Sequence, residues 1–414
     1  MTPRGHGALS ARLAGAILVS GCLVSLGTLA IGAGLPGPAA AMTVSAPGCS
    51  TAVAAAPALP AVGTAFVSGP EEPFGVAISA DGKTAFVADA SGAIVVYSLA
   101  STTPTLEEVD GFRPDRSDQP APPPLGGVSP LGLSLTPNGR YLIAADGAGG
   151  AVVFSVAALE RKGSPSSAWP VGLLGSGGLG AIETAVSPDG RYVFVTLENS
   201  MELAVFDLAR ALARGFGRSD LVGTVPLGVA PVGMAIAPDG RYLYVTSEAT
   251  TRQQQEGTLT TVDLAEAEVR PEHAVVSTVP AGCSPVRVAA SDTSVYVTAR
   301  GSDALLAFNA KDLVDHPAWS LDGEVPVGEA PVGLVLVDHG HTVVVADSDR
   351  FSAPGEGANL AVVTSVGRGQ LVLAGYVRAG SFPRDMAPSP HGTAILVSNF
   401  ASGQLEEVDE RALP

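Results

Sequence analysis

One pattern recurs seven times along the chain and restricts it to few folds. Each copy has a small apolar segment, a turn of the Pro-Asp-Gly type and a second segment that alternates aromatic and aliphatic residues, as in residues 231–248 (PVGMAIAPDGRYLYVTSE). Pro presets φ in such a turn and Gly tolerates positive φ, so each copy predicts strand, turn, strand. The copies begin 57, 51, 50, 54, 46 and 52 residues apart, at Pro73, Pro130, Ala181, Pro231, Pro285, Pro331 and Pro383.

Each copy is followed by further predicted strands. A third strand comes after a variable loop, at residues 93–98, 151–156, 202–207, 258–263, 304–309, 359–364 and 404–409. A weaker fourth strand precedes the next copy, at residues 221–226, 275–279, 323–327 and 371–377. Four antiparallel strands in a unit of about 40–50 residues make one blade of a β-propeller. The sequence therefore predicts an all-β fold, a seven-bladed β-propeller of four-stranded antiparallel blades.

The two ends of the repeat array predict how the ring closes. The last copy stops after its third strand, Gln404–Asp409, whereas an extra strand-like segment, Val62–Val67, precedes the first copy. We expect this N-terminal strand to complete the last blade, because a blade shared by both ends of the chain leaves no open edge. The propeller then spans residues 61–409 and leaves a short C-terminal tail at residues 410–414.

The N-terminus has the features of a signal peptide. Basic residues precede an uncharged apolar stretch, Leu13–Leu35, and small residues follow at Ala39–Ala41. We predict that residues 1–41 are a signal peptide that is cleaved off. Two alternatives stay open: lipidation of Cys22 in the lipobox-like sequence VSGC, and retention of the apolar stretch as a membrane anchor. All three place the rest of the chain outside the cytoplasm, either secreted or in the cell envelope.

Residues 42–60 are rich in Ala and Pro, and we predict a flexible tail for them. This tail contains Cys49, while Cys283 lies at the start of the fifth repeat copy. Two interpretations stay open. Either both cysteines are unpaired, or the tail reaches across one face and forms a disulfide, which an exported protein permits. An extended chain spans about 3.3 Å per residue, which makes that reach feasible.

The charge of the chain restricts its partners. It has 40 acidic residues against 23 Lys and Arg residues, a net charge of -17 at pH 7. Such a surface repels phosphate backbones, so we expect no nucleic-acid binding. We expect contact with a membrane only through a lipid or an N-terminal anchor, and a monomer in solution. We predict no cofactor and no metal site, because the sequence has no Cys-x-x-Cys pair, phosphate loop or zinc helix.

The aligned copies place charged residues at one mouth of the central channel. The first strand of each blade lines the axis, and strands can approach closely where its third residue is glycine, at Gly75, Gly132, Gly233 and Gly333. The other three blades carry Glu183, Arg287 and Asp385 there, with Arg384 next to Asp385. These four residues are either a binding site for a small polar ligand or a salt-bridge cluster that plugs the channel. In both cases we expect the arginines to lower the pKa of each acid.

Histidines and other acids are weaker candidates. His339, His341 and His391 fall in the turns between the first two strands of the last two blades, away from the predicted mouth. We interpret them as surface turn residues rather than metal ligands. Asp347 and Asp349 precede a loop that contains glycine, but their spacing fits no defined calcium loop.

The strand after the turn resembles a known family. The sequences YVTS at 244–247 and YVTA at 296–299, each behind its turn, resemble the YVTN-type repeat propellers, which are similar to lactonase-like seven-bladed propellers. The resemblance covers residues 61–409. It implies an Arg at the channel that holds an anionic or carbonyl substrate, and Arg384 matches that position. It also implies a His at a mid-chain blade start, but the sequence Gly180–Thr184 has none there.

Two classes of function remain. The first is an extracytoplasmic propeller that binds a small polar molecule or an extracellular protein on the mouth face, where the loops Thr250–Gly257 and Asp349–Gly357 are expected to gather. The alternative is a lactonase-like hydrolase that acts on a lactone or sugar lactone through Arg384 and Arg287, with Glu183 as the general base. The missing His favours the binding module.

Overall fold

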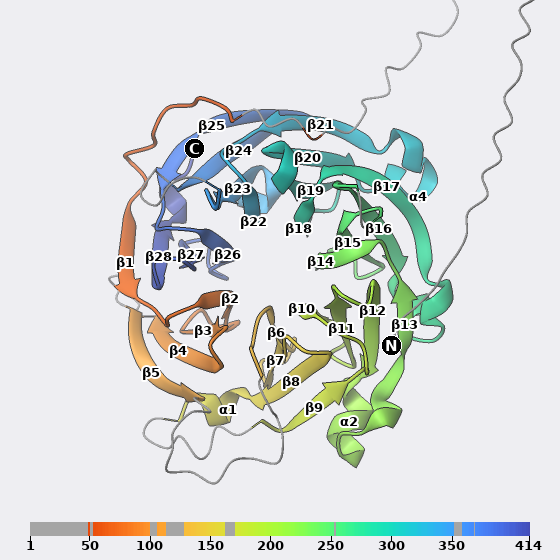
Figure 1. The fold of residues 1–414 in the computed structure, drawn as a ribbon. Coiled ribbons are helices and arrows are strands. Elements are labelled where there is room, and N and C mark those ends of the chain that lie inside the picture. The colour runs from red at the N-terminus through yellow and green to blue at the C-terminus, as the bar shows by residue number, and fades with distance from the viewer. Residues whose placement is uncertain are drawn as a thin grey trace, which may run out of the picture. The chain divides into compact units, whose positions relative to one another are not determined.

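The structure is a computed structural model, and it describes residue 49 and residues 53–99, 106–112, 128–161, 170–251, 254–351, 358–367 and 369–414. All of these belong to one compact unit, Thr43–Pro414. The predicted signal peptide, residues 1–41, lies outside the described residues. The described unit is a seven-bladed β-propeller with four-stranded antiparallel blades, as the repeat predicts (Figure 1).

The blades follow one another around the axis in chain order, and the first strand of each copy is innermost (Figure 1). From the axis outward, the strands are β2 Pro73–Ile78, β3 Thr84–Asp89, β4 Ala93–Leu99 and β5 Leu106–Phe112 in blade one; β6 Leu133–Leu135, β7 Tyr141–Ala145, β8 Gly150–Ser155 and β9 Gly172–Gly175 in blade two; β10 Ala181–Val186, β11 Tyr192–Leu197, β12 Glu202–Asp207 and β13 Leu221–Pro226 in blade three; β14 Val229–Ile236, β15 Tyr242–Ala249, β16 Glu256–Asp263 and β17 Val275–Cys283 in blade four; β18 Pro285–Ala290, β19 Ser294–Ala299, β20 Ala304–Asn309 and β21 Leu321–Pro326 in blade five; β22 Pro331–Val337, β23 Thr342–Asp347, β24 Asn359–Gly367 and β25 Gln370–Arg378 in blade six; and β26 Pro383–Pro388, β27 Ala394–Asn399, β28 Gln404–Asp409 and β1 Thr64–Ser68 in blade seven.

The N-terminal strand closes the ring. β1 pairs antiparallel with β28, and the register runs from Thr64 opposite Val408 to Ser68 opposite Gln404. The predicted closure by the segment before the first repeat copy is therefore confirmed. The last blade contains both ends of the repeat array, so β28 has a partner on each side.

Short helices follow the third strand in four blades, at α1 Val156–Leu159, α2 Leu208–Arg214, α3 Leu264–Ala267 and α4 Asp312–Asp315. The repeat pattern did not predict these helices. In three blades the last residue of the strand accepts a backbone N–H of the following helix, and Asp207 and Asp263 are the N-cap residues. Asp207 accepts the Arg210 N–H at 2.8 Å, Asp263 accepts the Glu266 N–H at 2.9 Å, and Asn309 accepts the Asp312 N–H at 3.0 Å. Single 3₁₀ turns lie at η2 Arg218–Asp220, η3 Pro271–His273, η4 Arg300–Ser302, η5 Pro317–Trp319, η6 Asp338–Gly340 and η7 Glu410–Ala412.

The core consists of hydrophobic clusters between neighbouring blades. Each of the seven blade interfaces has its own cluster of buried side chains. Phe86 and Phe154, for example, join blades one and two, while Val87 and Leu396 join blade one to blade seven. The alternating second strand of each repeat copy supplies both neighbours, because successive side chains point to opposite faces of the blade.

In four blades, a hydroxyl group of the second strand links the first strand of its own blade to the first strand of the next blade. Pairing between β10 and β11 shifts register at the blade start, and the Glu183 N–H donates to the Thr196 hydroxyl at 3.1 Å. That hydroxyl donates to the Val232 carbonyl of the next blade, also at 3.1 Å. The same arrangement recurs at Thr246, Thr298 and Ser398. The Thr of the Tyr-Val-Thr motif thus satisfies backbone groups that a regular ladder would pair.

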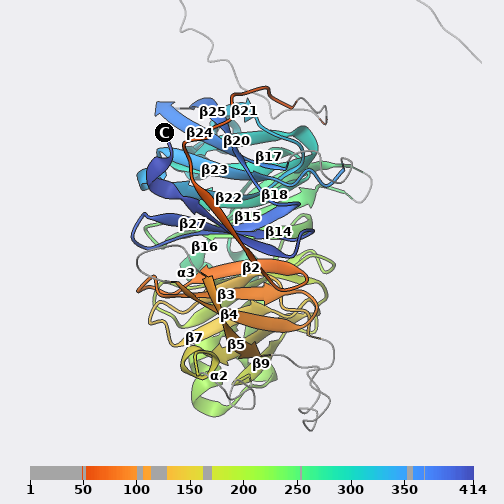
Figure 2. The same cartoon turned by 90° about the vertical axis from the view of Figure 1, so that its left-hand side faces the viewer.

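Part of the predicted tail is a strap on the outside of the propeller, consisting of Cys49 and residues 53–60. Cys49 forms a disulfide with Cys283, so the paired interpretation is correct. The Ala54 N–H donates to the Val327 carbonyl at 2.9 Å, and the Leu59 N–H donates to the Tyr376 carbonyl at 2.8 Å. The cross-link and these backbone hydrogen bonds hold the strap against the propeller. In Figures 1 and 2 the red-to-orange strap follows the outside of β25 before it enters β1.

Candidate functional site

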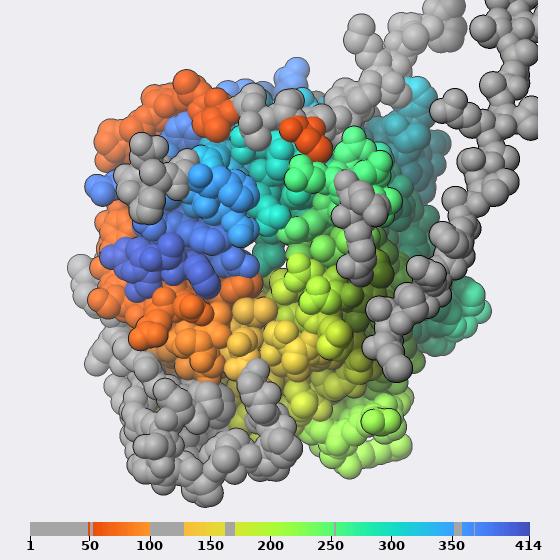
Figure 3. Space-filling model, in the orientation of Figure 1, coloured from red at the N-terminus to blue at the C-terminus, as the bar shows by residue number. Residues whose placement is uncertain are grey.

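The second residues of the first strands surround a cavity on the axis. The cavity has a volume of about 300 Å³, and its wall contains Ile182, Val232, Val286, Val332 and Arg384 from five blades. The three valines form one buried cluster, with Ile182 and Phe382 packed against it. Seen along the axis, the blades enclose a central hollow (Figure 3). Four blades thus line the mouth with an aliphatic side chain, whereas blade seven lines it with a guanidinium.

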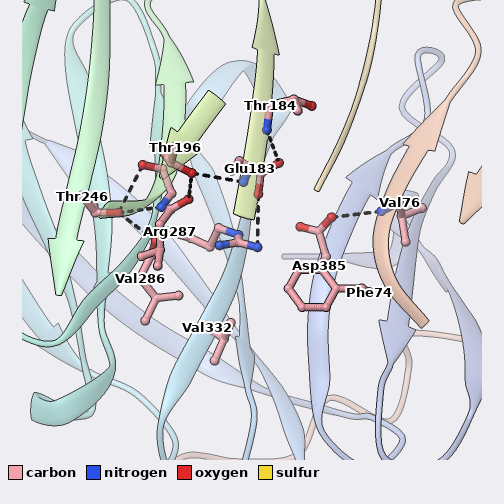
Figure 4. A network of polar contacts seen from close by, with 12 residues as sticks. Phe74, Val76, Glu183, Thr184, Thr196, Thr246, Val286, Arg287, Val332 and Asp385 are labelled. Carbon is pink, nitrogen blue, oxygen red and sulfur yellow. Dashed lines mark hydrogen bonds and ion pairs between the residues drawn. The ribbon is translucent and has the colours of Figure 1, made fainter. Parts of the chain in front are cut away.

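The third residues of the first strands lie next to this cavity, inside the channel. The guanidinium of Arg287 forms an ion pair with the Glu183 carboxylate at 3.1 Å, and the two side chains are only 9% and 13% exposed. Asp385 accepts a hydrogen bond from the Val76 N–H at 3.0 Å (Figure 4). Of these three side chains only Arg287 lines the cavity. The structure therefore brings the four predicted residues together, in two layers.

Glycine makes room for these side chains. A methyl group on Gly132 would overlap the Glu183 carboxylate, and one on Gly233 would overlap the Val286 carbonyl. The expectation that bare backbone allows close approach of the first strands is confirmed at both positions.

The pKa of each channel acid is raised, contrary to our expectation. Loss of hydration raises the pKa of Glu183 from 4.5 to about 7; Arg287 acts in the opposite direction and Asp385 adds to the rise. The pKa of Asp385 is raised for the same reason, against the effect of Arg287. The predicted net lowering of both pKa values is therefore wrong: the arginines do act in that direction, but removal from water outweighs the attraction of the cations.

Arg384 lies against aromatic rings. Its guanidinium carbon is 3.7 Å from the centre of the Phe74 ring and 5.4 Å from that of Phe382. Burial, followed by the repulsion of Arg287 and Arg350, lowers the pKa of Arg384 to about 9. Its Nε is buried and has no hydrogen-bond partner among the described residues. An anion placed beside it would relieve both the repulsion and the missing contact.

Four more charged residues line the cavity, and none of them was predicted from the sequence: Glu198, Glu248, Arg300 and Arg350. Glu248 and Arg300 form an ion pair at 3.0 Å. The repeat holds the signal for three of them, because Glu198, Glu248 and Arg300 each stand two residues after the Thr of the second strand. Arg350 lies in the loop after β23 and does not occupy this position of the repeat. It places the described start of this loop at the cavity, while residues 352–357 lie outside the described residues.

Two of the arginines at this mouth form no ion pair. Among the described residues, no carboxylate lies within ion-pair distance of Arg384 or Arg350. Both guanidiniums lie about 5.4 Å from the centre of the Phe382 ring. Burial lowers the pKa of Arg350 as well, and repulsion by Arg300 adds to the effect. In a chain with a net charge of -17, four arginines thus line the wall of this cavity against two glutamates, while Glu183 and Asp385 lie behind the wall.

The weaker candidates lie elsewhere. His339 and His391 line a separate cavity of about 660 Å³ at the turn ends of blades six and seven, together with Glu410. Within the described parts of the chain, no three His, Cys, Asp or Glu side chains are grouped to hold a metal ion. In the same parts, no helix has the length and apolar character needed to cross a membrane.

A protein-family model matches most of the chain. The model of the family described as "Lactonase, 7-bladed beta-propeller" matches residues 58–354. None of the curated proteins that were searched matches the chain.

Solved structures share the fold at low sequence identity. Hydrazine synthase of Kuenenia stuttgartiensis is 15% identical, with a TM-score of 0.59 over 82% of this chain and 96% of that one. A chain of a mitotic checkpoint complex is 12% identical, with a TM-score of 0.61 over 93% and 99%. The Cps50 (Swd1) propeller domain of Myceliophteria thermophila is 12% identical, with a TM-score of 0.58 over 83% and 98%. At such identity the likeness shows the propeller fold alone.

Proposed function

The chain belongs to the seven-bladed β-propeller lactonase family, and from this premise we propose that its channel mouth binds a small organic anion outside the cytoplasm. One observation carries the proposal. Arg384 and Arg350 face the same cavity of about 300 Å³, and neither has an acidic partner among the described residues. Arginine side chains bind carboxylates through paired hydrogen bonds, and these are strongest where water is excluded.

The shape of the cavity favours a small ligand over a protein partner. Its volume is at the lower end of the range for small-molecule pockets. The aliphatic side chains of Val232, Val286 and Val332 line the cavity, and the arginines line the same cavity. A compact carboxylate with a short carbon body fits this combination of charge and apolar wall.

The disulfide supports the proposed location. Disulfides persist in secreted and cell-envelope proteins and are rare in the cytosol. The cross-link between Cys49 and Cys283 joins a segment outside the repeats to the propeller, so oxidation is part of how this chain is held together. This agrees with export directed by residues 1–41.

Lactone hydrolysis is the second candidate, favoured by the family and by the acid Glu183. A pKa of about 7 suits a general base at neutral pH. The Glu183 carboxylate, however, is paired with Arg287 and does not line the cavity. A substrate in the cavity would therefore meet Arg287 before it met the base. The geometry favours binding over hydrolysis.

Thermal unfolding with a panel of small molecules tests the proposal. We expect acetate, lactate, gluconate or citrate to raise the melting temperature of the mature protein, because a ligand that binds only the folded state stabilises it. Sorbitol, a neutral relative of gluconate, should have no such effect, and sodium chloride controls for ionic strength. Equal stabilisation by sorbitol, or no stabilisation by any carboxylate, would contradict the proposal.

A hydrolysis assay separates the two candidates. With δ-gluconolactone as substrate, we expect no acceleration over buffer. Turnover by the wild-type protein that disappears in Glu183→Gln would establish the hydrolase instead.

A further inference from the structure

Two carboxyl groups lie near one arginine beneath the mouth (Figure 4). Glu183 comes from β10 and forms the ion pair with Arg287 of β18 at 3.1 Å. Asp385 comes from β26, and Arg287 is the strongest of the charges that favour its ionised form. Arg287 is also part of the cavity wall, whereas neither acid is. The same guanidinium therefore has acids on one side and the proposed ligand site on the other.

The charges around the channel mouth balance when the cavity is empty and every group is ionised. Glu183 and Asp385 offset Arg287 and Arg384 when all four are ionised. The other charged groups that line the cavity are Arg350, Glu198 and the pair of Arg300 with Glu248. A bound anion adds negative charge next to Arg287 and Arg384. It also competes with Glu183 for the Arg287 guanidinium, whose Nε and Nη2 have no hydrogen-bond partner among the described residues.

We propose that anion binding at the mouth is coupled to uptake of a proton by the Glu183–Asp385 pair. This inference rests on the proposed function and adds to it a property of the same site. One proton on the pair offsets the negative charge that the ligand brings. It also frees Arg287 to donate hydrogen bonds to the ligand. The proton comes from solvent, and no covalent bond of the ligand changes.

The titration of the pair supports this coupling. Loss of hydration already raises the pKa of Glu183 to about 7, so the group is near its midpoint in neutral solution. Additional negative charge raises the pKa of a carboxyl further. Linkage then requires the reciprocal effect: the anion binds more tightly where the pair is protonated. Affinity should be constant well below pH 7 and should fall above it.

Titration calorimetry with gluconate tests the inference, because this carboxylate stays ionised above about pH 5.5. Tris and imidazole serve as buffers, since both are cationic and differ in their heat of ionisation. At about pH 8 we expect close to one proton taken up per gluconate bound. The dissociation constant should rise about tenfold per pH unit above neutrality, which is the slope for one coupled proton.

Two variants locate the proton. Glu183→Gln should bind gluconate with little pH dependence and more tightly than the wild-type protein at about pH 8.5. Glu406→Gln is the matched control, because Glu406 is also a buried acid with a pKa raised to about 7. It lies in β28, the third strand of blade seven, where it is hydrogen-bonded to Asn399 and does not line the cavity. This variant should keep the wild-type slope. If Glu183→Gln fails to fold, the proton count of the wild-type protein decides alone.

The outcomes separate this inference from the proposed function. Gluconate binding with no exchange of protons and a constant affinity between about pH 6 and about pH 8.5 would overturn the coupling and leave the anion site standing. A pH dependence that survives in Glu183→Gln and is lost in Glu406→Gln would also overturn it. Absence of binding at every pH would end both.

Discussion

Replacing Cys49 and Cys283 with serine is expected to lower the free energy of unfolding by about 3–5 kcal/mol. The disulfide joins residues 234 positions apart, so it removes a large share of the conformational freedom of the unfolded chain. Its loss also releases the end of the strap, which Val327 and Tyr376 would then hold only through hydrogen bonds. Urea unfolding of the oxidised wild-type protein and the double variant measures the difference.

Tyr376→Phe is the control for the strap itself. The Tyr376 hydroxyl donates to the Ala54 carbonyl at 2.7 Å, and the variant removes this bond while the cross-link stays intact. We expect a loss of about 1 kcal/mol. Two free thiols in the denatured, unreduced mature protein, or a double variant as stable as wild type, would contradict the role given to the disulfide.

The free energy of unfolding should fall as the pH rises from about 5 to about 8, by about 3 kcal/mol through Glu406 alone. Burial raises the pKa of Glu406 from its ordinary value of 4.5 to about 7. Between these values the folded state holds a proton that the unfolded state has lost, so folding weakens as protons become scarce. Each pH unit in this window corresponds to about 1.4 kcal/mol. Glu183, with a similarly raised pKa, acts in the same direction.

Glu406→Gln tests this assignment. The amide keeps the shape of the protonated acid and can still accept from Asn399, whose Nδ2 donates to Glu406 at 3.0 Å. The variant should be more stable than wild type at about pH 8 and should show a smaller dependence on pH. Stability that instead increases from about pH 5 to about pH 8 would show that Glu406 is ionised in the folded protein.

Most of the fold could be predicted from the sequence repeat. Seven aligned copies were enough to predict the blade number, and the misfit between the two ends was enough to predict that β1 pairs with β28. Both depend on local patterns of strand and turn. The disulfide was one of two open interpretations, but the course of the strap could not be predicted, because it depends on the edge of β25, which lies more than three hundred residues away in the chain. The capped helices were missed because four to seven residues are too few for a helical period to show.

The candidate site was predictable in position but not in electrostatics. The alignment of the blade starts predicted that Glu183, Arg287 and Asp385 lie close together, and the structure places them close together. The same alignment applied to the second strand would have found Glu198 and Glu248. The direction of the pKa changes depends on how completely the channel removes water, and that quantity has no signature in the sequence.

The affinity of Arg384→Gln for gluconate tests the central claim most directly. Arg384 is the one cavity-lining cation that the family resemblance, the repeat and the structure all place at the mouth. A hydrogen bond to a charged group contributes about 1.5–3 kcal/mol, so the variant should bind roughly ten- to hundredfold more weakly than wild type. Arg241→Gln, which removes an arginine stacked on Tyr242 at a turn outside the mouth, should bind like wild type. Unchanged affinity in Arg384→Gln would contradict the account.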